Sequence, residues 1–165
     1  MSESLQRPWD ELARAASASE EAGQAELPRE LLCLSVDGVR YAAPVERVRE
    51  IVRMRPVTPI PRVPKEVIGV ISLRGQVVQV VDLRLRLGVP ALTPTRTHRI
   101  VVLHGDECEV SGLLVDSVHE VLRVTEDAIQ PPATGDSGYV NALCAHGGAF
   151  VGLLNIEKVL DLGIA

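Results

Sequence analysis

Two stretches of the chain recur in the same order at nearly the same spacing. Residues 45–54 match residues 115–124 with four of ten positions identical, and residues 75–83 match residues 148–156. The offsets are 70 and 73 residues. A unit of this size is too small to enclose a large core alone, so two copies gain stability by packing against each other. The repeat therefore predicts two similar subdomains with a groove between them.

Short runs rich in β-branched residues dominate the chain from residue 31 onward. Glycines and prolines separate these runs, and Asp37-Gly38 is a typical hairpin turn. Strands are expected at residues 32–36, 67–73, 77–83, 99–104, 108–115 and 149–154. Near the end, Asn155 is expected to cap a short helix that places Ile156, Val159 and Leu160 on one face. The pattern is typical of an all-β barrel or sandwich with a short C-terminal helix.

The first thirty residues have a different composition. They contain seven acidic residues against three basic ones, and Ala, Ser, Glu and Gln dominate residues 13–26. Trp9, Leu12, Ala13 and Ala16 fall at helical spacing, but they bury too little apolar surface to fold alone. We predict an acidic, disordered tail over residues 1–30 and a folded part over residues 31–165. The tail has no apolar leader segment and the chain has no run of 18 apolar residues, which predicts a cytoplasmic protein.

Composition argues against several classes of function. Four aromatic residues and a net charge of −5 disfavour nucleic-acid binding, which needs stacking platforms and positive charge. No nucleophile motif, phosphate-binding loop or paired zinc-ligand spacing occurs, so we predict no enzymatic activity, no metal and no cofactor. Three widely spaced cysteines predict reduced thiols. Residues 31–90 carry ten basic residues against five acidic ones, whereas residues 91–165 carry four against ten, a pattern that orients protein partners.

The first repeat contains an apolar triplet at a spacing of three residues. Val45, Val48 and Ile51 are separated by charged residues, and Val115, Val118 and Val121 form the matching triplet. This spacing predicts an apolar stripe on a short helical or turned segment. Two interpretations stay open: both triplets fill the cores, or they line the groove and receive the apolar face of a partner helix.

Two further features are candidates for binding. Arg74 stands beside Gly75 between two strands, and a partly shielded pair with Glu50 would fix the geometry of the groove mouth. The Pro-rich stretch at residues 56–64 is too rigid for a flexible linker. It either presents Val57, Ile60 and Val63 as a docking surface or packs on its own barrel.

The residues in these segments resemble the CheW chemotaxis coupling protein family. The resemblance runs in order through residues 41–51, 57–64, 68–84, 112–122 and 154–160, and covers residues 31–162. It implies two SH3-like five-stranded β-barrels packed on a shared core, without catalytic activity. It also implies two partners, which are the cytoplasmic tip of methyl-accepting chemoreceptors and the regulatory domain of the histidine kinase CheA.

The resemblance assigns roles to particular positions. The receptor-binding groove would use Val45, Val48, Glu50, Ile51, Arg74, Val115, Val118 and Val121. Kinase contact would fall on residues 57–62, with Val57, Ile60, Pro61 and Arg62, and on residues 132–139, with Tyr139. Ser72 and Gln79 depart from the Asn and Pro that are common in the family.

Three alternative functions stay open. A chemosensory system that controls surface motility or another output would use the same domain. A regulator that binds a small molecule in the groove and an enzyme are the remaining alternatives, and the missing nucleophile–base pair disfavours the enzyme.

Overall fold

The computed structural model describes residues 27–105, 109–132 and 138–162. Strands account for most of the regular structure and the helices are short, as predicted. The elements are β1 (Arg29–Val36), β2 (Val39–Pro44), η1 (Val45–Arg47), β3 (Val48–Arg53), β4 (Val67–Leu73), β5 (Gln76–Asp82), α2 (Leu83–Arg86), β6 (Arg99–His104), β7 (Val110–Val115), β8 (Ser117–Val124), η3 (Glu126–Ala128), β9 (Ile129–Gln130), β10 (Val140–His146), β11 (Ala149–Leu154) and α3 (Ile156–Leu160).

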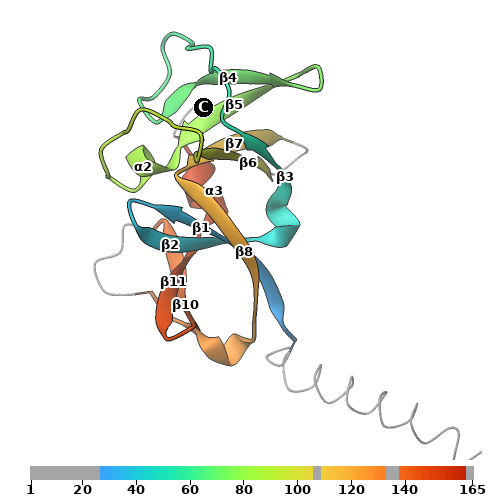
Figure 1. Ribbon diagram of the computed structural model, residues 1–165, viewed down its shortest axis with the longest axis vertical. Helices are drawn as coiled ribbons and strands as arrows, with labels where there is room; N and C mark the ends of the chain where they lie inside the picture. Colours follow the sequence, from blue (N-terminus) through green and yellow to red (C-terminus); the bar gives the residue numbers. More distant parts are fainter. Residues whose placement is uncertain (1–26, 106–108, 133–137, 163–165) are drawn as a thin grey trace, which may run out of the picture.

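The strands form two sheets, stacked one above the other in Figure 1. The lower sheet has the order β8-β1-β2-β11-β10-β9 and the upper sheet the order β3-β6-β7-β5-β4. Each contains one parallel pair, β2 with β11 and β5 with β7, and its other pairs are antiparallel. Strands at the same position of the two orders are counterparts in the repeat, for example β8 and β3, or β1 and β6. The two-residue β9 is an extra strand of the lower sheet.

Each sheet closes on itself into a barrel. In the upper sheet, Thr58 and Val70 exchange two backbone hydrogen bonds of 2.9 and 2.8 Å, which join the chain after β3 to β4. In the lower sheet, β9 follows β8 and pairs with β10 through Ile129 and Cys144. Closure removes the exposed edges that an open sheet would leave.

Three apolar clusters fill the molecule. One lies inside the lower barrel and includes Leu31 and Cys33 of β1, and another lies inside the upper barrel and includes Ile100 and Val102 of β6. The third cluster lies between the barrels. It combines residues of both sheets, and its fully buried members include Leu34, Leu83, Leu103 and Leu113. The barrels therefore pack on a shared core.

The two copies of the repeat exchange strands. The first copy supplies β1 and β2 to the lower barrel but β3, β4 and β5 to the upper one, and the second copy does the reverse with β6 to β11. The expectation that each copy forms its own subdomain is therefore wrong. The chain crosses between the barrels immediately after β2 and again after β7.

Several boundaries follow the sequence expectation. Strands β4, β6 and β11 and the cap of α3 lie where they were predicted, and Ile156 and Val159 are buried. β1 begins at Arg29, inside the segment predicted as tail, and residues 1–26 of that segment lie outside the described residues.

Asp82 caps α2 from a buried position, as Asn155 caps α3 at the matching place of the second copy. Asp82 Oδ1 accepts a hydrogen bond from the backbone N–H of Arg84 at 2.9 Å, and Asn155 Oδ1 accepts one from that of Lys158 at 3.2 Å. Burial raises the pKa of Asp82 above its ordinary value of 3.8. A raised carboxyl pKa costs folding stability above the folded pKa, and this cost disappears below the unfolded pKa.

We expect Asp82→Asn to keep the cap and to be at least as stable as the parent protein at pH 7. Any gain should shrink as the pH falls towards the ordinary pKa of 3.8. Asp82→Ala should instead lose about 1 kcal/mol of stability, because it removes the cap. Urea unfolding at pH 7 and pH 4 measures both effects. Equal losses for the two variants at pH 7 would show that the charge, not the cap, stabilises this turn.

Candidate functional site

The two apolar triplets lie mainly on strands, whereas a short helical or turned segment was predicted. Only Val45 belongs to a helical turn, and β3 begins at Val48. The spacing of three arises from a β-bulge in each strand. Val48 pairs with Leu103 and Ile51 pairs with Val101, so one extra residue in β3 brings Val48 and Ile51 to the same face.

The second triplet repeats this arrangement in β8. Val118 pairs with Leu34 and Val121 pairs with Leu32, again with one extra residue in the bulged strand. The four partner residues in β1 and β6 all belong to the shared core. The four aliphatic residues of the bulged strands therefore face the side on which the two barrels pack together.

The six aliphatic residues differ in their burial. Val115 ends β7 and is fully buried in the shared core, so the prediction that it lines an accessible groove is wrong. Val45, Val48 and Val118 are half-buried and pack against the same cluster. Ile51 and Val121 are 41% and 47% exposed. Val115 therefore fits the interpretation that the triplets fill the cores, whereas for Ile51 and Val121 the groove interpretation stays a prediction.

Glu50 and Arg74 form the predicted contact. Arg74 Nη2 lies 3.5 Å from Glu50 Oε1, and Arg74 is mostly exposed while Glu50 is mostly buried. Arg74 has a φ of 53° in the two-residue turn that it forms with Gly75. A side chain in this left-handed region costs about 1–2 kcal/mol relative to glycine. The turn therefore holds an arginine where a glycine would be more stable.

The Pro-rich stretch packs on its own barrel at one end and is exposed at the other. Val57 packs against the core of the upper barrel, next to the paired Thr58. Ile60 is half-buried, and Pro61 and Arg62 are exposed.

Tyr139 is half-buried near the other predicted kinase contact. Its ring lies under the guanidinium of Arg86 at 4.7 Å and packs against the shared core. Arg86 also donates hydrogen bonds to the backbone carbonyls of Lys158, Val159 and Asp161 at the end of α3. Tyr139 therefore has a structural role, and residues 133–137 of the predicted contact lie outside the described residues.

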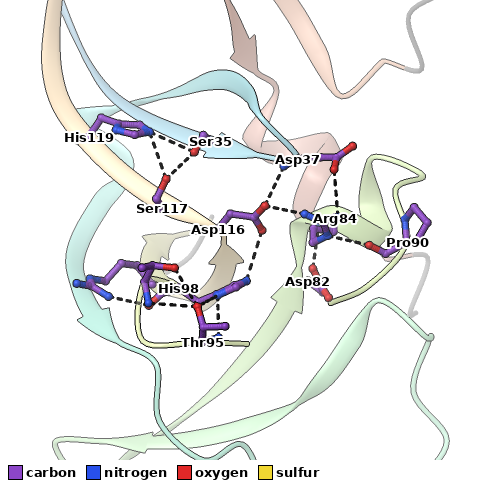
Figure 2. A network of polar contacts seen from close by, with 12 residues as sticks. Ser35, Asp37, Asp82, Arg84, Pro90, Thr95, His98, Asp116, Ser117 and His119 are labelled. Carbon is purple, nitrogen blue, oxygen red and sulfur yellow. Dashed lines mark hydrogen bonds and ion pairs between the residues drawn. The ribbon is translucent and has the colours of Figure 1, made fainter. Parts of the chain in front are cut away.

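A buried polar network joins the barrels, and sequence reasoning missed it. Figure 2 shows Arg84 of α2 between Asp116, Asp37 and Pro90. Arg84 Nη1 donates to Asp116 Oδ2 at 2.6 Å, Nη2 lies 3.3 Å from Asp37 Oδ1, and Nε donates to the Pro90 carbonyl at 2.7 Å. The Asp37 N–H also donates to Asp116 Oδ2. Since Asp37 lies in the β1–β2 turn and Arg84 follows β5, the network ties the two barrels together.

His98 lies at the edge of this network and is buried. Its Nδ1 accepts a hydrogen bond from the Thr95 backbone N–H at 2.9 Å, which leaves the proton of a neutral ring on Nε2. Nε2 lies 3.6 Å from Asp116 Oδ1, and neither atom has a hydrogen-bond partner among the residues that the structure describes. The ring thus presents its N–H side to Asp116 across a gap.

An exposed ion pair occupies the place that matches the Arg84–Asp116 contact. Glu157 is the counterpart of Arg84 in the repeat, and it pairs with Arg47 in the crossover after β2. The charges of the two pairs are reversed. Arg84 follows β5 and contacts the acidic Asp116 after β7, whereas Glu157 follows β11 and contacts the basic Arg47 after β2. Alignment of the two copies does not show this reversal, because Arg47 aligns with Ser117 and Asp116 aligns with the acidic Glu46.

The described residues contain no feature that indicates catalysis. They include no group of three metal-ligating side chains and no helix that is long and apolar enough to cross a membrane. Cys33 and Cys144 are free and buried, and burial raises the pKa of both thiols. Both are therefore core residues of low reactivity.

Comparison with known proteins agrees with this fold. A family model described as CheW-like domain matches residues 30–163. The chain is 36% identical over 135 residues to Chemotaxis protein CheW of Rhizobium meliloti, covering 79% of this chain and 86% of that protein. It is 33% identical over 147 residues to Protein FrzA of Myxococcus xanthus, covering 85% and 90%.

A solved structure has the same fold. The crystal structure of scaffolding protein TtCheW from Thermoanaerobacter tengcongensis matches with a TM-score of 0.76 and 27% sequence identity, covering 82% of this chain and 94% of that chain. Because the family model spans most of the chain and the relatives match over most of their own length, this chain belongs to the CheW family and is a non-enzymatic scaffold of chemotaxis.

Proposed function

We propose that this protein couples methyl-accepting chemoreceptors to the histidine kinase CheA, with one surface for each partner. The observation that supports the receptor surface most is the matched exposure of Ile51 and Val121. A helical partner would bury these two residues together with Val48 and Val118, which already pack on the shared core. In this proposal the protein is cytoplasmic and joins receptor arrays at the membrane.

The receptor surface consists of Ile51 and Val121 on top of the half-buried Val48 and Val118. This arrangement suits the apolar face of an amphipathic helix, which contacts residues on two walls at once. The Glu50–Arg74 pair adjoins Ile51 and supplies a polar rim. The positive φ of Arg74 follows from its two-residue turn, as that of Asp37 does in the β1–β2 turn, and the mostly exposed guanidinium is accessible to a partner.

The kinase surface consists of the exposed part of residues 57–62, at the far end of the upper barrel. Pro61 and Arg62 are exposed, and Arg62 has a φ of 58°. Thr58 fixes this loop to β4, so a partner meets a preformed surface and binding orders few side chains. Val57 and Ile60 support the loop from below, and Tyr139 supports the corresponding region of the lower barrel.

The shared core and the Arg84 network explain how a scaffold passes a signal between two surfaces. They hold the barrels in one relative orientation, so a receptor and a kinase bound at different places are fixed with respect to each other. A small shift of the receptor then changes the kinase geometry, and the two binding equilibria are coupled.

The test is an aspartate at the most exposed part of the receptor surface. We expect Ile51→Asp to weaken binding of a receptor cytoplasmic fragment about tenfold or more, because a charge would be buried against an apolar helix face. Kinase affinity should be unchanged. Isothermal titration calorimetry with each partner measures both, and circular dichroism checks the fold.

Phe150→Asp provides the matched control. Phe150 lies on β11, outside the proposed receptor surface, and is 57% exposed. It should leave receptor binding unchanged. The proposal fails if a folded Ile51→Asp protein binds the receptor fragment as tightly as the parent does. Val48→Asp is a poorer test, since Val48 packs on the shared core.

A further inference from the structure

We propose that the acidic segment at residues 1–26 docks on the face that carries Ile51 and competes there with the receptor. The competition rests on the proposed function, whereas the docking itself does not. The proposed occupant of this face is a segment of the same chain. Three observations support it: where the segment joins the barrel, the uncompensated charge of the face, and the residues that the segment contains.

The segment joins the folded part next to the receptor surface. A hollow of about 400 Å³ is lined by Pro28, Arg29, Glu30 and Leu31 on one side and by Pro44, Val45 and Glu46 on the other. Val45 is the first residue of the triplet that leads to Ile51. Leu27, the first described residue, is 48% exposed. The route from the segment to the face therefore begins in a concave, partly apolar site.

The face around Ile51 carries positive charge without compensation. Arg53 shares the strand face of Ile51 and stands directly opposite Arg99 of β6. Like charges directly opposite each other destabilise a sheet. In the part of the chain that the structure describes, neither guanidinium forms an ion pair with a carboxylate, and Arg99 donates only to backbone carbonyls of Arg96 and His98. An acidic partner would relieve this repulsion.

Val121 has a similar neighbour. Arg123 follows it on the same face of β8, so each half of the repeat places an arginine two residues after an exposed aliphatic residue. Arg123 stands directly opposite the acidic Glu30 of β1, so the unfavourable pairing of two arginines belongs to the Ile51 side. The Ile51 side therefore fits a partner that has a carboxylate beside its apolar anchor.

Residues 1–26 have this composition. They contain six acidic residues against two basic ones, and Asp10 and Glu11 lie between Trp9 and Leu12. Trp9 and Leu12 fall on one side of a helix, with Ala16 one turn further on. Trp9 is 19 residues from Pro28, which is about 28 Å as a helix. The length is sufficient to reach Ile51, six residues beyond Val45.

Trp9 gives the test a specific probe, because it is the single tryptophan of the chain. We expect its emission in the full-length protein to be shifted to shorter wavelength than in a synthetic peptide of residues 1–26. It should also be less accessible to acrylamide. Ile51→Asp and Arg53→Glu should each return both properties to those of the peptide, and Phe150→Asp should not. If Ile51→Asp does not fold, Arg53→Glu still tests the docking.

The effect on the receptor is measured separately. A full-length Trp9→Gln/Leu12→Gln variant should bind the receptor fragment three- to tenfold more tightly, as expected if the segment covers the face in two-thirds to nine-tenths of the molecules. If no receptor binding occurs at all, the proposed function fails while the fluorescence result still decides the docking.

Three results would overturn the docking. Trp9 emission equal to that of the peptide would show that the segment is in solvent. If Trp9 is protected and neither Ile51→Asp nor Arg53→Glu changes its emission, the segment docks on another surface. Protection that is lost on dilution would show that it binds a second copy of the chain.

Discussion

Replacing Asp116 by alanine is expected to destabilise the protein by about 3 kcal/mol, the lower end of the range for a broken buried ion pair. Arg84 is only 7% exposed and would lose its shortest charged contact, the 2.6 Å bond to Asp116. Asp37 at 3.3 Å and the Pro90 carbonyl would remain, which is why the loss stays at the lower end. The melting temperature should fall by roughly 10 °C.

The repeat supplies the control for this experiment. Glu157→Ala breaks the matching pair with Arg47, but Glu157 is 62% exposed. An exposed pair contributes below about 1 kcal/mol. Urea unfolding of both variants at pH 7 compares the two sites directly. If Asp116→Ala and Glu157→Ala lose the same free energy of unfolding, the Arg84 network does not hold the two barrels together.

A double variant separates the buried charge from the lost contact. Arg84→Met/Asp116→Leu removes both partners and leaves no uncompensated charge. Such replacements are often neutral or stabilising, so the double variant should recover most of the loss seen in Asp116→Ala. If it is as unstable as the single variant, packing around the network matters more than charge.

Gly69→Ala should have an effect of similar size on the upper barrel. Gly69 has a φ of 146°, and an added Cβ would lie 2.2 Å from the Thr58 carbonyl oxygen and 2.8 Å from Val57 Cγ1. Relief of this contact requires Thr58 to move, which breaks its two hydrogen bonds with Val70. Backbone strain of 1–3 kcal/mol and the overpacking together predict a loss of about 3–5 kcal/mol.

Gly75→Ala separates the effect of backbone strain from the effect of the steric clash at Gly69. Gly75 has a φ of 79°, and no heavy atom lies within 4 Å of an added Cβ. This variant should lose only about 1–2 kcal/mol. Thermal unfolding ranks the variants, and hydrogen exchange of the Thr58 and Val70 amides reports whether the closure opens. Equal losses for the two glycine variants would show that the Thr58 contact has little effect.

Much of the local structure was predictable from local signals. The ends of β4, β6 and β11 follow from β-branched runs that stop at turn residues, and Asn155 marks the start of α3. The apolar triplets were also recognisable, although the sequence did not distinguish the exposed Ile51 and Val121 from the buried Val115. These features depend on neighbours a few residues away.

Features that depend on distant partners were not predictable. The bulge in β3 imitates helical spacing, so Val48 and Ile51 were assigned to a helical or turned segment. Val115 resembles the other members of its triplet in sequence, yet its place at the end of β7 buries it. The Arg84–Asp116 contact links residues that no local pattern relates.

The exchange of strands has a consequence for synthesis on the ribosome. β1 pairs with β8 as well as with β2, so the amino-terminal strand waits for roughly ninety further residues before its second neighbour exists. Neither barrel can close from a nascent chain that ends after α2. Contacts between such distant segments slow folding, which leaves newly made β1 and β2 in need of protection until translation is nearly complete.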